Sequence, residues 1–255
     1  MPAIISVHSF RGGTGKSNVT ANLAATIARK GRRVAIVDTD IQSPGIHVLF
    51  GLTEESIGKS LNDYLWDRSS IDEAAHDVSD RLAQNGQGSG GGTLFLIPSS
   101  IKTGEIARVL REGYDVGKLN DGFQDLLERL SLDYLFIDTH PGLNEETLLS
   151  ITISDVLLLI LRPDQQDYQG TSVTVEVARK LGVPRLLMVV NKTPQIFDPA
   201  EVKTRVEQAY SSEVAAVLSH SDEMMALGSA GLFVLRYPEH PVSAAIQQIA
   251  EKIIG

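Results

Sequence analysis

The chain reads Phe10-Arg11-Gly12-Gly13-Thr14-Gly15-Lys16-Ser17 directly between two apolar segments. Residues 3–7 have the length and composition of a buried strand, and residues 16–30 carry apolar side chains at helical spacing. A strand, a glycine-rich turn and a Lys-Ser pair that opens a helix together predict a phosphate-binding loop. In such a loop the backbone N–H groups of small residues point inward, and the helix N-terminus adds partial positive charge.

The residue types of this loop also predict contacts with a nucleotide. Lys16 is expected to reach the β- and γ-phosphates, and the hydroxyl of Ser17 is expected to ligate Mg²⁺. The other loop residues expected to bind the nucleotide are Gly12, Gly13, Thr14, Gly15 and Asn18. The cofactors predicted from the loop are therefore ATP and Mg²⁺.

The loop departs from the common P-loop pattern, which has a glycine where Phe10 stands. A basic residue and a glycine pair precede Thr14 instead, and this pattern resembles the deviant Walker A motif of the MinD/ParA family of ATPases. The family has a lysine at the position of Arg11, and that lysine crosses a dimer interface to the partner's nucleotide. An arginine keeps the charge and grips phosphate oxygens with a rigid fork, so the resemblance implies this role for Arg11. The alternative is that Arg11 contacts its own nucleotide or solvent.

Two aspartates one residue apart, Asp38 and Asp40, follow the apolar run at residues 34–37. Residues two apart in an extended chain project to the same side, so both carboxylates can face one site. The pair resembles the second acidic motif of the MinD/ParA family. The resemblance implies that Asp40 orients the attacking water and that Asp38 supports the metal and phosphate shell. The alternative is a polar strand end with solvated acids.

A second acidic element follows the apolar residues Leu135 to Ile137 and ends in Asp138-Thr139-His140-Pro141-Gly142. This is a Walker B pattern, in which Asp138 is expected to hold Mg²⁺. The turn at Gly142 is placed to sense the γ-phosphate. Most relatives carry a small residue or a proline where His140 stands, and a positional variant in a loop is expected there rather than a catalytic imidazole.

Weaker signals concern the nucleobase. Asn191 ends an apolar run, as in relatives that read adenine with this asparagine, and the alternative is a turn-forming asparagine. Residues 219–222 occupy the loop where relatives close over the base.

Strand-like apolar runs alternate with helical patterns almost to the end of the 255 residues. The alternation predicts an α/β fold with a doubly wound, mainly parallel sheet and helices on both faces. One domain over residues 1–255 is expected, with a flexible glycine-rich loop at about 84–92. The predicted strands span residues 3–7, 33–38, 93–97, 134–138, 156–161, 185–191 and 214–218, with a further short one at 232–235. The predicted helices span residues 16–30, 104–111, 118–130, 145–153, 170–181, 199–210 and 242–254.

Composition excludes several kinds of chemistry. The chain has no cysteine, which excludes disulfides, thiolate zinc sites and the iron–sulfur clusters of some relatives. Its longest apolar run, residues 156–161, is too short to span a membrane, and no signal peptide is evident, so a cytoplasmic protein is expected.

The charge pattern indicates whether the protein could bind DNA or a membrane surface. The net charge of −9 and the acidic residues between the basic ones at 179–205 disfavour non-specific DNA binding, although it stays possible. Residues 244–255 lack the basic, bulky face of a membrane-surface helix, so no intrinsic membrane anchor is expected.

The resemblance implies a Mg-dependent ATPase that forms a homodimer with ATP and separates after hydrolysis. Such a protein positions a cellular cargo or regulates a partner, and an unidentified activating or adaptor protein stimulates its slow turnover. Two other classes stay open. One is a P-loop ligase of the dethiobiotin or cobyrinate amidation type, which needs a second substrate pocket. The other is a non-hydrolysing, ATP-bound scaffold.

Overall fold

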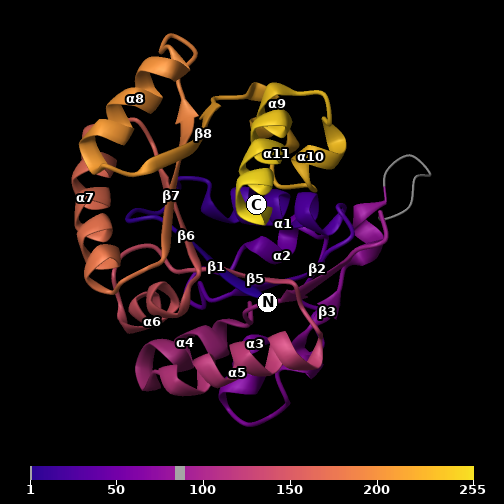
Figure 1. The fold of residues 1–255 in the computed structure, drawn as a ribbon. Coiled ribbons are helices and arrows are strands. Elements are labelled where there is room, and N and C mark those ends of the chain that lie inside the picture. Colours follow the sequence, from indigo (N-terminus) through magenta and orange to yellow (C-terminus); the bar gives the residue numbers. More distant parts are fainter. Residues whose placement is uncertain (1, 84–89) are drawn as a thin grey trace.

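The computed structural model describes residues 2–83 and 90–255. One eight-stranded sheet has the strand order β3-β4-β2-β5-β1-β6-β7-β8 (Figure 1). All neighbouring strands are parallel except β3 and β4, which pair antiparallel. The strands are β1 (Ala3–His8), β2 (Arg33–Asp38), β3 (His76–Asp77), β4 (Thr93–Ile97), β5 (Tyr134–Asp138), β6 (Val156–Leu161), β7 (Arg185–Thr193) and β8 (Glu213–Ser219).

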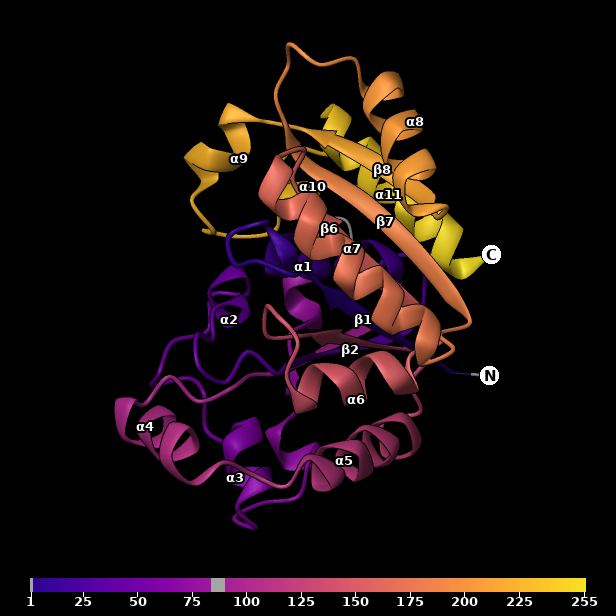
Figure 2. The same cartoon turned by 90° about the vertical axis from the view of Figure 1, so that its left-hand side faces the viewer.

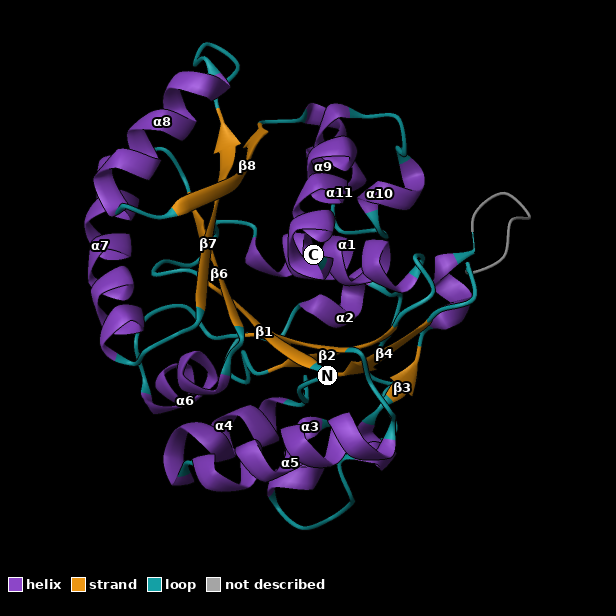
Figure 3. Cartoon of the chain, viewed as in Figure 1, coloured by secondary structure: helices purple, strands orange, loops and turns teal. Residues whose placement is uncertain are grey.

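Helices connect the parallel strands and cover both faces of the sheet (Figure 3). The α-helices are α1 (Lys16–Ala28), α2 (Ile46–Leu49), α3 (Leu61–Leu65), α4 (Thr103–Glu112), α5 (Val116–Arg129), α6 (Glu145–Ile153), α7 (Gln165–Lys180), α8 (Pro199–Tyr210), α9 (Asp222–Leu227), α10 (Phe233–Arg236) and α11 (Pro241–Ile254). Two short 3₁₀ helices span Asp72–Ala74 and Ser79–Leu82. No helix in the described ranges is long and apolar enough to cross a membrane.

Three groups of buried apolar side chains hold the layers together. One joins α1, α10 and α11 to the sheet, a second joins α3 and α5 to β2 and β5, and a third joins α7 and α8 to β6 and β7. Figure 2 shows α7 running alongside β6 and β7. All six residues of β6 are buried, as expected for a strand covered on both faces.

The predicted fold class is confirmed, and strands lie at all seven main predicted positions. The short strand predicted at 232–235 is wrong, because Phe233–Arg236 form the helix α10. The Phe233 ring lies beside that of Tyr237, four residues on, with ring centroids 5.0 Å apart, a contact that the apolar run alone does not reveal. Helix α7 begins earlier than predicted, since the Asp164 side chain caps it by accepting from the backbone N–H of Asp167.

The glycine-rich stretch predicted as a flexible loop lies partly outside the described residues, which omit 84–89. Its last glycines, Gly90 and Gly92, lie against the end of α1. A Cβ atom would lie 2.2 Å from the Arg29 carbonyl oxygen at Gly90, and 1.8 Å from the Ala28 carbonyl oxygen at Gly92. Close approach of two backbones therefore requires glycine at both positions.

Strand order brings the polar residues of the loop and of both acidic motifs to one edge of the sheet. Val7 of β1 pairs with Asp138 of β5, and Asp38 of β2 pairs with the same residue from the other side. The carboxyl ends of β1, β2 and β5 therefore meet, which is where ligands bind in open α/β sheets.

Candidate nucleotide-binding site

The loop between β1 and α1 has the backbone shape of an anion cradle. Gly13 and Gly15 have positive φ angles, 77° and 92°, a region that favours glycine. A Cβ atom on Gly15 would lie 2.4 Å from the amide nitrogen of Asn191, so a side chain at this position would collide with β7. No side chain caps the start of α1, which leaves its first N–H groups available to a ligand.

Lys16 and Asp138 form a buried ion pair at the centre of the site. Lys16 Nζ lies 2.8 Å from Asp138 Oδ1, and the two side chains are 7% and 1% exposed. The hydroxyl of Thr20 donates to the same oxygen at 3.1 Å. The other carboxylate oxygen, Oδ2, is buried and has no hydrogen-bond partner. A buried, unpaired acceptor is costly, so this oxygen is suited to a cation or an ordered water.

Asp38 lies beside this pair and is fully buried. Its Oδ1 accepts a hydrogen bond from the backbone N–H of Asp40 at 3.0 Å, and its Oδ2 has no partner. Burial, reinforced by the charge of Asp138, raises the pKa of the Asp38 carboxyl well above its ordinary value. A cation bound nearby would offset that cost.

The oxygen atoms at this site are suited to Mg²⁺ that is bound together with a nucleotide, and they are too few to hold a metal ion by themselves. The described residues contain no group of three or more His, Cys, Asp and Glu side chains able to hold a metal. Mg²⁺ is typically bound by one or two carboxylates together with phosphate oxygens and water. The unpartnered oxygens of Asp38 and Asp138 are hard donors of this kind, and Ser17, at the start of α1, is half-buried.

Asp40 and His140 contact each other directly. His140 Nδ1 lies 2.7 Å from Asp40 Oδ1, and the side chains are 24% and 14% exposed. The sequence placed both residues after strands at the site, but it did not indicate that they pair.

His8, the last residue of β1, is a polar core residue that the sequence analysis missed. Its side chain is fully buried, and Nδ1 lies 2.7 Å from the hydroxyl oxygen of Thr139. That hydroxyl can donate to the Val7 carbonyl at 3.1 Å, which leaves its oxygen to accept from His8. Burial, with smaller effects from the charges of Lys16 and His140, lowers the pKa of His8 to about 3.

Arg11 contacts acidic residues at the start of α7. Its Nη1 lies 3.1 Å from Asp167 Oδ1 and 3.4 Å from Asp164 Oδ1. Asp167 is 2% exposed, and its second oxygen accepts from the backbone N–H and Nε of Arg162, at 2.9 and 3.2 Å. The neighbouring Phe10 lies against Gly170 of the same helix. The residues that replace the usual loop pattern thus both pack on α7.

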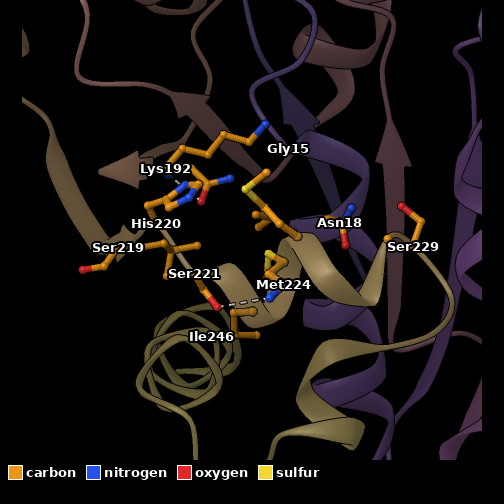
Figure 4. A pocket seen from close by; sticks show the side chains of 14 residues that line it. Gly15, Asn18, Lys192, Ser219, His220, Ser221, Met224, Ser229 and Ile246 are labelled. Atoms are coloured by element: carbon orange, nitrogen blue, oxygen red, sulfur yellow. Dashed lines mark hydrogen bonds between the residues drawn. The ribbon is translucent and has the colours of Figure 1, made fainter. Parts of the chain in front are cut away.

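A cavity of about 410 Å³ adjoins the loop. Figure 4 shows Gly15 and Asn18 on one side of this cavity and His220, Ser221 and Met224 on the other. The loop at residues 219–222 contributes Ser219, His220 and Ser221 to the lining of this cavity. The amide nitrogen of Asn191 donates to the Thr14 carbonyl at 2.8 Å, so this side chain also ties the loop to β7. Lys192, which the sequence analysis did not single out, donates from Nζ to the Gly13 carbonyl at 2.9 Å.

A second cavity, of about 310 Å³, lies beside Thr39 and His140. Tyr114 and Glu146 also line it, and the Tyr114 hydroxyl donates to Glu146 Oε2 at 2.5 Å. Burial raises the pKa of Glu146. Its Oε1 is buried and has no hydrogen-bond partner.

A parallel sheet, a glycine loop that opens a helix, and acidic residues on the adjacent strands define a P-loop nucleotide-binding protein. A family model described as an AAA domain matches residues 2–183. An uncharacterized ATP-binding protein of Methanocaldococcus jannaschii is 26% identical over 256 residues, covering 100% of this chain and 89% of that protein. The chain belongs to this AAA-domain family and to the MinD/ParA family of P-loop ATPases.

Solved structures agree with this assignment at the level of the fold. The septum site-determining protein MinD of Pyrococcus horikoshii, solved with Mg-ADP, superposes with a TM-score of 0.79 at 21% identity, covering 99% of this chain and 96% of that one. A ParA family ATPase from Chlorobium tepidum superposes with a TM-score of 0.74 at 17% identity, covering 98% and 99%.

Proposed function

We propose that this protein is an ATP-dependent dimerisation switch: Mg-ATP joins two subunits, and hydrolysis to ADP and phosphate separates them. The switch positions a cargo or regulates a partner protein, as γ-phosphate switches do by changing which state binds. The family assignment and the Mg-ADP of the Pyrococcus horikoshii MinD structure support nucleotide binding.

The observation that carries this proposal is the arrangement of Lys16, Asp138 and Asp38 beneath the loop. The lysine and two carboxylates are buried together, and each carboxylate keeps one unpartnered oxygen. Lys16 would bind the β- and γ-phosphates, while Ser17, Asp138 and Asp38 would hold Mg²⁺ directly or through water. Bound Mg²⁺ would neutralise charge on the phosphates as the bond to the γ-phosphate breaks.

Asp40 is the proposed residue that orients the attacking water. It follows Asp38 by two residues and is only 14% exposed, so its carboxylate is largely shielded from bulk solvent. The base is proposed to occupy the 410 Å³ cavity, with Asn191 and Asn18 beside it.

Arg11 is the proposed residue that crosses the dimer interface. To reach a partner's phosphates it must leave Asp164 and Asp167. Asp167 would not become unpaired, because Arg162 still donates to its other oxygen. The exchange replaces carboxylate partners with phosphate partners, which an arginine fork also binds.

The test is molar mass by light scattering after gel filtration, without nucleotide, with Mg-ADP and with Mg-ATP. Wild type is compared with Asp40→Ala and Arg11→Ala. We expect a dimer only with Mg-ATP, longer-lived in Asp40→Ala because hydrolysis is blocked, and lost in Arg11→Ala.

A mass unaffected by nucleotide in both wild type and Asp40→Ala contradicts the switch. That outcome, together with turnover stimulated by a small carboxylate, would favour the ligase class, for which the 310 Å³ cavity is the available second pocket. A dimer with negligible turnover even in the presence of a partner would favour the ATP-bound scaffold.

A further inference from the structure

We propose that His140 is a positioning residue for Asp40, holding one carboxylate oxygen so that the other faces the attacking water. This inference rests on the proposed ATP hydrolysis. It assigns a role to a residue for which the sequence analysis expected only a positional variant in a loop.

The contact is directional. His140 Nδ1 lies 2.7 Å from Asp40 Oδ1, and an ionised carboxylate can only accept, so the hydrogen in this bond belongs to Nδ1. The backbone N–H of Ser43 donates to the same oxygen at 3.2 Å. No described residue donates to Oδ2. One oxygen of Asp40 is therefore held from two sides, and the other is left for a water molecule.

The strand register creates this pair. Asp38 and Asp138 are direct partners in the β2–β5 ladder, so Asp40 and His140, each two residues further on, leave the sheet side by side. The backbone on the His140 side is also anchored, because the Thr147 hydroxyl donates to the His140 carbonyl at 3.5 Å. The Thr147 N–H is in turn held by the Asn144 side chain at 2.7 Å, at the start of α6.

The rotamer of the Asp40 carboxylate matters for hydrolysis, because a catalytic group that is misplaced by about 1 Å can lower the rate about 100-fold. Without the imidazole, Asp40 keeps only the Ser43 bond and can turn about its χ angles. The expected loss is about 10- to 100-fold in kcat. KM for ATP and the ATP-dependent dimer should change little, because the role runs through Asp40 rather than through the nucleotide.

Amide substitutions separate this role from mere filling of space. The amide nitrogen of asparagine lies as many bonds from the backbone as Nδ1 of histidine, while that of glutamine lies one methylene further out. We expect His140→Asn to keep kcat within about fivefold of wild type, and His140→Gln and His140→Ala to lose about 10- to 100-fold. Equal kcat in all four proteins, or equal losses in Asn and Gln, would overturn the proposal.

A measurement without nucleotide tests the contact itself. In a long-range ¹H–¹⁵N spectrum of the wild type, we expect His140 to carry its hydrogen on Nδ1, and Asp40→Ala to change that signal. A neutral His140 protonated only at Nε2 would overturn the inference.

The two proposals fail in different ways. If the wild type neither dimerises with ATP nor hydrolyses it, the proposed function fails and the positioning role fails with it. If the wild type does both and the His140 variants match it in kcat, only the inference fails.

Discussion

At the scale of single residues, His8 makes the stability of the fold depend on pH. The ring is fully buried and its pKa is lowered to about 3, because charging it would place a cation in the core beside Lys16. The unfolded chain takes up this proton near pH 6.5, whereas the folded chain resists it. Between these pH values the unfolded state binds more protons, so stability falls as the pH falls.

We expect His8→Asn, which keeps a donor toward Thr139, to flatten this dependence. The wild type should lose up to about 1.4 kcal/mol more per pH unit than the variant between pH 6.5 and 4. Urea unfolding at pH 7.5, 6 and 5 measures the difference. Asp38, whose pKa is raised, acts with the opposite sign but is present in both proteins. Parallel pH curves would show that His8 does not titrate as described.

At the scale of elements, the contact between Phe10 and α7 couples the phosphate loop to a helix. Gly170 is buried within α7, and a Cβ atom there would lie 1.9 Å from a carbon of the Phe10 ring. The ring occupies the space that a side chain at residue 170 would need. The position of the loop and that of α7 therefore depend on each other.

A double-mutant cycle tests this coupling. Gly→Ala inside a helix usually stabilises by about 1 kcal/mol, but Gly170→Ala should destabilise because the new methyl meets the Phe10 ring. In a Phe10→Ala background, Gly170→Ala should instead stabilise the protein, as Gly→Ala usually does inside a helix. Urea midpoints of the four proteins give the coupling energy. Stabilisation of similar size in both backgrounds would show that the ring moves aside freely.

The elements differ in how well the sequence predicts them. Apolar runs such as β6 and the loop from Phe10 to Ser17 carry local signals, and they lie where the sequence placed them. Helices α2, α3 and α9, each of four to six residues, show too few turns for a helical period. Helix α10 reads as a strand because its apolar residues are consecutive.

The candidate site divides in the same way. The sequence identified Lys16, Asp38 and Asp138 from motifs, each on the expected element. It did not predict that His140 contacts Asp40 or that Arg11 contacts Asp167, since both contacts join residues at least 100 positions apart. Such contacts follow from strand register and helix placement, which no local pattern contains.

At the scale of the whole molecule, the ion pairs of Arg11 with Asp164 and Asp167 affect the proposed dimer, because they hold Arg11 within its own subunit. Asp164 is 42% exposed and caps α7, whereas Asp167 is buried, and both aspartates also pair with Arg162. Asparagine caps a helix as well as aspartate does. Asp164→Asn therefore removes a charge that holds Arg11 within its own subunit, and it keeps the helix.

We expect Asp164→Asn to strengthen the Mg-ATP dimer by roughly twofold to fivefold in dissociation constant, in line with the small worth of exposed ion pairs. Sedimentation equilibrium with Mg-ATP in the Asp40→Ala background measures it, and Arg11→Ala with Asp164→Asn is the control. A weaker dimer in Asp164→Asn would mean that Asp164 supports the interface instead.

Basic residues elsewhere are already engaged within the fold. Arg179 donates to the Ser211 carbonyl at 3.2 Å, and Arg185 donates to the Lys252 carbonyl at 2.6 Å. Lys252 itself pairs with Glu213. The mixed charge of this face, and with it the weak non-specific DNA binding expected from the sequence, stays a prediction.

The ion pair between Lys16 and Asp138 has a consequence for ligand selectivity. Any anion that enters the loop competes with a carboxylate 2.8 Å from the lysine, in a place shielded from water. Free phosphate or sulfate can compete with the Asp138 carboxylate for Lys16 only through its charge. In the proposed function, a nucleotide would also supply a base to the 410 Å³ cavity and a metal to the unpartnered oxygens of Asp38 and Asp138. Under the proposed function, Lys16 would therefore bind a nucleotide in preference to free inorganic anions.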